Sequence, residues 1–187
     1  MATHANVRDE RLDVDEYMAL PEEDGYRLEL YRGRLVREPG PGPRHGRVAF
    51  RVLDLLRREG EEKGRGLVFF DTGFTLTSAP ATVRIPDVAF VTSSRIPEEG
   101  VTDRFWELTP DLVVEVVSPS DLASEMQQKA VDYLDTGARM VWVVDPARRT
   151  VTVYRSRAEI RILVEGEILD GGDVLPALRA AVESLFS

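Results

Sequence analysis

Two acidic side chains stand inside stretches of the sequence that are otherwise apolar. Asp87 lies in VRIPDVAFV, directly after Pro86, and Glu115 lies in the middle of DLVVEVV. Both stretches have the β-branched and aromatic composition of a buried strand. A buried carboxylate without a partner is costly or becomes protonated, so each acid needs a cation, a metal or a hydrogen-bond donor. On neighbouring strands, the two acids could share one hard cation such as Mg²⁺ or Mn²⁺.

The alternation of side chains along a strand decides which residues accompany each acid. It groups Asp87 with Ala89 on one face, and Glu115 with Val113. Taken singly, either acid could form a structural ion pair or cap a turn, because ion pairs commonly perturb buried acids. The occurrence of two such acids, separated by a hairpin-length segment, favours a shared cation site instead.

The composition limits the kinds of site that this chain can build. No cysteine occurs among the 187 residues, which excludes disulfides and thiolate-bound metals and suits a cytoplasmic protein. His4 and His45 are too few for a histidine-rich zinc site. No apolar run reaches about 18 residues, and the N-terminus lacks the pattern of a signal peptide. We therefore expect one compact cytoplasmic domain without a membrane span.

The charge of the chain bears on its partners. A net charge of −9 argues against broad, non-specific affinity for nucleic acid, which needs clustered Lys and Arg. A cation site, however, requires concentrated carboxylates, and a bound metal restores positive charge where a phosphate docks. Five arginines also gather in or near one segment: Arg44, Arg47, Arg51, Arg57 and Arg58.

The elements that must position these residues follow from local patterns. Asp13 and Glu16 have the capping-box spacing of a helix start. Two short strands flanking an Arg-Gly pair, YRLEL and RLVRE, predict a tight hairpin. Residues 39–46 form a Pro/Gly hinge, and the apolar spacing after it predicts a helix from Arg47 to about residue 63.

The central part of the chain alternates between strands and one further helix. Strands are predicted in LVFFDTGFTL, VRIPDVAFV and DLVVEVV, and a helix over residues 121–135 is ended by Gly137. The nearly all-apolar MVWVVD predicts a strand covered on both faces, and TVTVYR and EIRILVE predict an antiparallel pair. This order predicts an α/β fold, with a mixed sheet and a helix on either face.

These segments resemble a known family. Pro86 and Asp87, followed by Glu115, Val116 and Val117, resemble the PD-(D/E)xK nuclease superfamily. More closely, the chain resembles the Uma-type family of restriction endonucleases. The supporting segments are DEYMALPEEDGYRLELYRGRLV, PGPRHGRV, VRIPDVAFV, PDLVVEVVSPSD, VWVVDP and a helix that contains Lys129. The resemblance extends over nearly the full length, as far as GGDVLP.

The resemblance implies a restriction-endonuclease-like mixed sheet flanked by helices, with an N-terminal helix and β-hairpin extension. We accordingly predict a single domain over residues 1–187. The helix and hairpin extension would occupy 1–43, the nuclease core 44–145, and the C-terminal strands and tail 146–187.

The chain departs from the superfamily pattern at one position. A lysine is expected two residues after the second acid, where this sequence has Val117. The resemblance implies that Lys129, on the following helix, supplies the amine instead. At about 100° per residue, Lys129 falls about 20° outside Leu122, at the margin of the apolar face of this helix. By geometry alone it could reach solvent or turn inward toward Glu115; the resemblance favours the inward, active-site role.

Other residues are weaker candidates. Glu29 lies on the strand face opposite Leu28, where a solvent-exposed hairpin acid is the default, and the resemblance implies an additional role at the metal site. His45 is expected on the inward side of a helix start, either as a structural residue or in contact with a phosphate. Asp71 is an acid candidate of the same weaker sort.

Several alternative chemistries lack their motifs. Ser118 and Asp121 are expected to cap the helix that follows, and Ser118 has neither a nearby histidine nor a GxSxG elbow. The GxxxxGK[ST] and GxGxxG loops that bind phosphates and dinucleotides are absent as well.

We therefore predict a metal-dependent endonuclease that hydrolyses DNA phosphodiester bonds. Asp87, Glu115 and the Val116 carbonyl would bind Mg²⁺ or Mn²⁺, and Lys129 would hold or polarise the attacking water. DNA is the expected partner, and a homodimer is compatible with double-strand cleavage. The alternatives are a non-catalytic protein of this fold that acts as a DNA-binding or protein-interaction module, and a metal-dependent phosphodiesterase acting on RNA or nucleotides.

Overall fold

The computed structural model describes residues 11–187, so His4 and most of the segment assessed for a signal peptide lie outside the described residues. At its centre is a six-stranded sheet with the order β10-β9-β8-β7-β6-β3. β7 and β8 are parallel, whereas the other neighbouring strands are antiparallel. In chain order the strands are β3 (Gly66–Phe70), β6 (Val88–Thr92), β7 (Leu112–Val116), β8 (Met140–Asp145), β9 (Thr150–Tyr154) and β10 (Ile160–Leu163).

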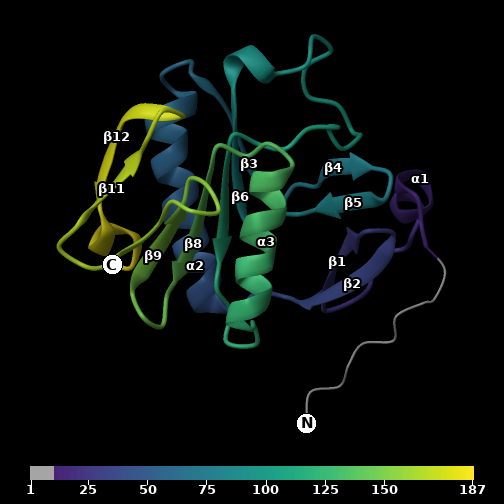
Figure 1. Ribbon diagram of the computed structural model, residues 1–187, viewed down its shortest axis with the longest axis horizontal. Helices are drawn as coiled ribbons and strands as arrows, with labels where there is room; N and C mark the ends of the chain where they lie inside the picture. Colours follow the sequence, from purple (N-terminus) through teal and green to yellow (C-terminus); the bar gives the residue numbers. More distant parts are fainter. Residues whose placement is uncertain (1–10) are drawn as a thin grey trace.

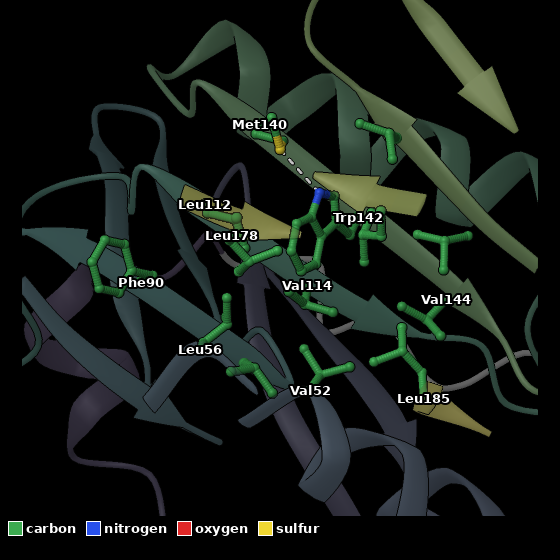
Figure 2. Packing of buried hydrophobic residues seen from close by; sticks show 14 of the residues in the cluster. Val52, Leu56, Phe90, Leu112, Val114, Met140, Trp142, Val144, Leu178 and Leu185 are labelled. Carbon is green, nitrogen blue, oxygen red and sulfur yellow. Dashed lines mark hydrogen bonds between the residues drawn. The ribbon is translucent and has the colours of Figure 1, made fainter. Parts of the chain in front are cut away.

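Two helices cover the two faces of this sheet (Figure 1). α2 (Pro43–Leu56) contributes Val52 and Leu56 to the cluster that also holds Phe90 and Trp142, and Figure 2 shows these four side chains within it. α3 (Ala123–Asp135) covers the opposite face, where its side chains join those of β7 and β8 in a second cluster. Every residue of β8 is buried, as predicted for a strand covered on both sides. The predicted α/β fold with a mixed sheet and a helix on either face is confirmed.

The C-terminal segment completes the core on the α2 side. β11 (Ile168–Gly171) and β12 (Leu175–Ala181) form an antiparallel pair, followed by a 3-10 turn over Val182–Leu185. Leu178 and Leu185 from this segment pack into the same cluster as Trp142 (Figure 2). The predicted antiparallel pair of β9 and β10 is also confirmed.

The N-terminal elements form a second sheet beside the first. Its strand order is β2-β1-β5-β4, with β1 (Tyr26–Tyr31), β2 (Arg34–Pro39), β4 (Phe74–Ser78) and β5 (Ala81–Arg84). The predicted hairpin is confirmed, since Arg32 and Gly33 form its turn with φ of 52° and 80°. The predicted capping box is confirmed too, because Asp13 and Glu16 cap α1 (Val14–Met18) reciprocally.

The prediction of three continuous strands was wrong for the first two. LVFFDTGFTL divides into β3 and β4 at Asp71, whose φ is 48°, and VRIPDVAFV divides into β5 and β6 around Pro86. In each case the first and second halves belong to different sheets. Because proline has no N–H to donate, a sheet ladder readily ends at such a residue. Asp87 therefore stands where the chain passes from the small sheet into the large one.

The predicted bounds of the first long helix also need correction. α2 begins at Pro43, inside the expected hinge, and ends at Leu56, where a π-helical turn over Arg57–Glu61 follows. Proline is favourable in the first turn of a helix, since the N–H that it lacks would have no partner there. His45 consequently lies within the first turn of α2.

The expected cap of α3 was wrong as well. The residue before the helix is Leu122, which makes no capping hydrogen bond. Asp121 instead accepts a hydrogen bond from the Ser118 N–H, at 2.7 Å, and closes the preceding turn. Among the helices of residues 11–187, none has the length and apolarity needed to cross a membrane.

Candidate functional site

Asp87 is held on both of its carboxylate oxygens. Arg27 from β1 donates to Oδ1 at 3.2 Å, while the Val116 N–H donates to Oδ2 at 2.7 Å. His45 Nε2 lies 3.1 Å from the same Oδ2. Burial opposes ionisation of Asp87, but these contacts with His45, Arg27 and the Val116 N–H outweigh it and lower the pKa of Asp87. The carboxylate at the junction of the two sheets is therefore ionised.

Glu115 lies one strand away, on the α3 face of β7. Its Oε1 accepts a hydrogen bond of 2.8 Å from the Tyr133 hydroxyl, while its Oε2 accepts none from residues 11–187. Burial raises the pKa of Glu115 to about 8, against the attraction of Lys129. The negative charges of Asp87 and Glu29 add to the rise. Glu115 thus holds a proton at neutral pH unless a cation replaces it.

Glu29 from β1 is wholly buried and is surrounded by cationic and N–H donors. Its Oε2 accepts from Arg84 at 2.7 Å and lies 3.2 Å from Lys129 Nζ, and its Oε1 accepts from the Ile85 N–H at 2.9 Å. Burial would raise the pKa of Glu29, but Lys129, Arg84 and the Ile85 N–H together lower it to about 2. The predicted strand face of Glu29 is correct, but it is not the exposed hairpin acid of the default interpretation.

Lys129 points inward from α3 and is only 8% exposed. Besides Glu29 it forms a close ion pair with Glu38 from β2. Within residues 11–187 it forms no ion pair with Glu115. Burial would lower the pKa of Lys129, but the charges of Glu115, Glu29 and Glu38 raise it above its usual value. Lys129 therefore remains an ammonium at neutral pH.

A cleft of about 360 Å³ opens beside this network. Arg27 forms part of its wall and links it to the site, because it contacts Asp87, Glu38 and the half-exposed Asp71 at the same time. The cleft is lined by Gly25, Tyr26, Arg27, Gly40, Pro41, Asp71 and Ile85. Asp87 itself stays 96% buried behind Arg27, so access to it from this side leads past the guanidinium.

The structure gathers the residues that the sequence singled out. Asp87, Glu115, Glu29, Lys129 and His45 belong to one connected set of buried polar groups. The Val116 N–H joins the set through the main chain, and Asp71 touches it through Arg27. At the position of the missing superfamily lysine, Val117 packs against the cluster under α3. The catalytic roles of these residues stay predictions.

Four residues that contact the site were not predicted from the sequence: Arg27, Arg84, Glu38 and Tyr133. For two of them, the spacing along the chain could have indicated the contact. Arg27 is two residues from Glu29 in the same strand, and Tyr133 is four residues from Lys129 in the same helix. Arg84 and Glu38 reach the site through pairing between strands, which local spacing does not reveal.

The donor chemistry around Asp87 and Glu115 fits a hard divalent cation. Within residues 11–187, no group of three or more Asp, Glu or His side chains is arranged to hold a metal ion. Mg²⁺, however, commonly uses one or two carboxylates and completes its shell with water and substrate phosphates. Glu115 Oε2, which has no donor among residues 11–187, and Asp87 Oδ1, which accepts from Arg27, are carboxylate oxygens of the kind that such a shell uses.

Comparison with known proteins shows which fold and which family the chain is similar to. The fold is similar to a crystal structure from Anabaena variabilis described as a "putative nuclease", with a TM-score of 0.83 and 23% identity over 94% of this chain and 97% of that one. At this identity the likeness shows the fold alone. No curated protein matches the chain. A family model, Uma2, described as "Putative restriction endonuclease", matches residues 14–183. Since this match covers most of the sequence, the chain belongs to the Uma2 family.

Proposed function

We propose that the protein is a metal-dependent endonuclease that hydrolyses DNA phosphodiester bonds. In this proposal Asp87 and Glu115, with the Val116 carbonyl, hold Mg²⁺ or Mn²⁺. The observation that carries it is the contrast within this pair: Asp87 is ionised and fixed, whereas buried Glu115 keeps an oxygen that no donor of residues 11–187 contacts. The nuclease descriptions of the family and of the Anabaena structure support the same reaction class.

A bound divalent cation supplies Lewis-acid stabilisation of the scissile phosphate and lowers the pKa of water. Arg27, His45 and the Val116 N–H contact the Asp87 carboxylate and fix it in place, which supports its proposed role as a ligand of that cation. We assign His45 as a positioning residue for Asp87, because its Nε2 faces that carboxylate. The predicted phosphate contact of His45 stays a prediction.

Lys129 has the charge that a phosphoryl-transfer site needs. As a permanent ammonium it can orient the attacking water and stabilise charge that develops on the phosphate oxygens. Glu29 and Glu38 hold its Nζ, so we assign Glu29 a positioning role through Lys129 rather than direct contact with the cation. The amine thus comes from α3, and Val117 leaves the strand position apolar.

The test is cleavage of plasmid and linear duplex DNA in Mg²⁺ or Mn²⁺. Asp87→Ala and Glu115→Ala should abolish metal-dependent cleavage, and Lys129→Met should slow it on the order of 10²- to 10³-fold, as expected for loss of one electrostatic group. Glu125→Gln, which changes an exposed acid on the same helix as Lys129, is the matched control and should cleave like the parent. Circular dichroism checks that every variant is folded.

Calorimetric titration with Mn²⁺ separates this proposal from a non-catalytic protein of the same fold. The nuclease should bind Mn²⁺ in the parent and lose that binding in Asp87→Ala. Absence of any Asp87-dependent binding, together with equal cleavage by parent and variants, would overturn the proposal. A parallel panel of RNA and small phosphodiesters distinguishes DNA from the other substrates of such a site.

A further inference from the structure

The outward face of α2 carries three arginines that have no partner within residues 11–187. Arg44 and Arg47 are exposed and Arg51 is half-buried. None of the three forms an ion pair, hydrogen bond or ring contact with another described residue, and each keeps its full charge for a ligand. We call this set the arginine row.

The arginine row contrasts with the other arginines of the chain. Most described arginines outside it are ion-paired. The nearest examples are Arg57 and Arg58, just beyond the end of α2, which pair with Asp54; Arg57 also pairs with Glu62. The chain has a net charge of −9, so acidic side chains are plentiful. The row nevertheless lies where no described acidic side chain pairs with it.

The spacing of the row makes one continuous track. Positions 44, 47 and 51 are related by three and four residues, so they lie within about 60° of one another around the helix. From the first to the last, the helix advances about 10 Å. The neighbouring face of α2 is buried, with His45, Val48 and Val52 directed into the protein, so the row lies along the border of the buried face, with Arg44 and Arg47 exposed and Arg51 half-buried. The three arginines therefore form one track along the helix surface.

The row begins at the candidate site. Arg44 directly precedes His45, whose Nε2 lies 3.1 Å from Asp87. Gly40 and Pro41, which line the cleft beside Asp87, lead directly into α2. Figure 1 shows α2 running along the sheet from this end, so the row extends away from the cleft along the length of the helix.

We propose that the arginine row binds the phosphate backbone of duplex DNA and guides one strand to the cleft at Asp87. This inference rests on the proposed nuclease function and names the surface through which its substrate docks. One guanidinium group can donate two parallel hydrogen bonds to two oxygens of a phosphate. Several guanidinium groups in a row can therefore contact successive phosphates of a DNA backbone. The net charge of −9 does not oppose such binding, because phosphate binding depends on local cations without acidic partners. The arginine row supplies such cations beside the site.

The test is binding rather than cleavage. Fluorescence anisotropy with a labelled duplex, in EDTA over a series of NaCl concentrations, gives the slope of log K against log salt. Each phosphate contact contributes about −0.9 to this slope for duplex DNA, so the triple variant Arg44→Ala, Arg47→Ala, Arg51→Ala should reduce its magnitude by about 2.7. The Arg→Lys triple variant should keep most of the slope. Arg57→Ala with Arg58→Ala, the ion-paired control, should leave it nearly unchanged.

The outcomes separate this inference from the proposed function. If the Arg→Ala triple variant keeps the parent's slope of log K against log salt, the proposal that the arginine row binds DNA is overturned, even if the protein cleaves DNA. A slope reduced as expected would support the row, even if no cleavage occurs in Mg²⁺. An equal loss in the Arg57/Arg58 control would overturn it, because the effect would then be one of general charge. A change confined to single-stranded DNA or RNA would overturn the assignment to duplex DNA.

Discussion

Two glutamates of the site are both buried but have different partners and opposite shifts of their pKa. Glu29 comes from β1 in the four-stranded sheet, and Glu115 from β7 in the six-stranded sheet. Glu29 has a lysine, an arginine and a main-chain N–H around its carboxylate, and its pKa falls to about 2. Among residues 11–187, Glu115 accepts a hydrogen bond only from the Tyr133 hydroxyl, and burial raises its pKa to about 8 against the attraction of Lys129. The immediate partners, and not the depth of burial, decide which acid is ionised.

This difference separates two roles that the sequence could not distinguish. Between these two glutamates, Glu29 holds Lys129 and Arg84 in place with its carboxylate. A carboxylate that is buried and short of partners retains the capacity to bind a further cation. The pair therefore divides into an anchored acid and an available one, in the pattern by which sites give different roles to chemically similar acids.

The largest expected effect is on stability, measured by urea unfolding at neutral pH in EDTA. Glu29→Gln leaves Lys129 and Arg84 buried without their shared anion and should cost about 3–5 kcal/mol. Glu115→Gln replaces a neutral carboxyl by an amide of the same shape, which can still accept from Tyr133. Because the amide also spares the folded protein the uptake of a proton that Glu115 requires above pH 4.5, the substitution should not destabilise the protein at neutral pH and should raise its free energy of unfolding by a few kcal/mol. Equal costs for the two substitutions would refute the division into anchored and available acids.

The next effect is a pH dependence of stability. The folded-state pKa of Glu115 is about 8, above its ordinary value of 4.5, so the folded protein keeps a proton that the unfolded chain loses. The resulting stability is present at low pH and is lost as the pH rises through about 8, at up to about 1.4 kcal/mol per pH unit. Glu29 has the opposite sign, and its contribution is lost only as the pH falls from about 4.5 toward 2.

The measurement compares the parent with Glu115→Gln in EDTA between pH 5 and about pH 8, where Glu29 stays ionised. The parent should lose a few kcal/mol over this range relative to the variant. Added Mn²⁺ should remove the loss, since a cation bound at Glu115 takes the place of the proton. Parallel curves for the two proteins without metal would contradict the raised pKa.

Much of the frame around these acids could be predicted from local pattern. Strand alternation correctly placed Val88 and Phe90 on one face of the sheet and Ala89 on the other, and β6 and β7 are neighbours as expected. The all-apolar run of β8 correctly indicated a central strand. These features follow from periodicity and composition within a few residues, which is why the sequence reveals them.

The remaining features depend on partners that are distant in the chain. The passage of the chain between two sheets at Pro86 was missed, because an apolar run does not show that its halves pair with different strands. Glu29 was expected at the surface by default, but Arg84 and Lys129, 55 and 100 residues later, allow its burial. The protonation of Glu115 was likewise hidden, since it depends first on burial and then on the charges of Lys129, Asp87, Glu29 and Glu38, which are distant in the sequence.

The smallest effect concerns the hydrogen bond that Glu115 accepts from Tyr133. Tyr133→Phe removes this donor and should cost about 1 kcal/mol while the carboxyl is neutral. Above about pH 8 the acceptor becomes a carboxylate, and hydrogen bonds to charged groups contribute about 1.5–3 kcal/mol, so the cost should grow with pH. Tyr17→Phe is the matched control, because the Tyr17 hydroxyl donates at 2.6 Å to the Leu28 carbonyl, which does not titrate. A cost that grows equally in both variants would mean that Glu115 is not the group changing its charge; growth in Tyr133→Phe alone assigns the titration to the available acid.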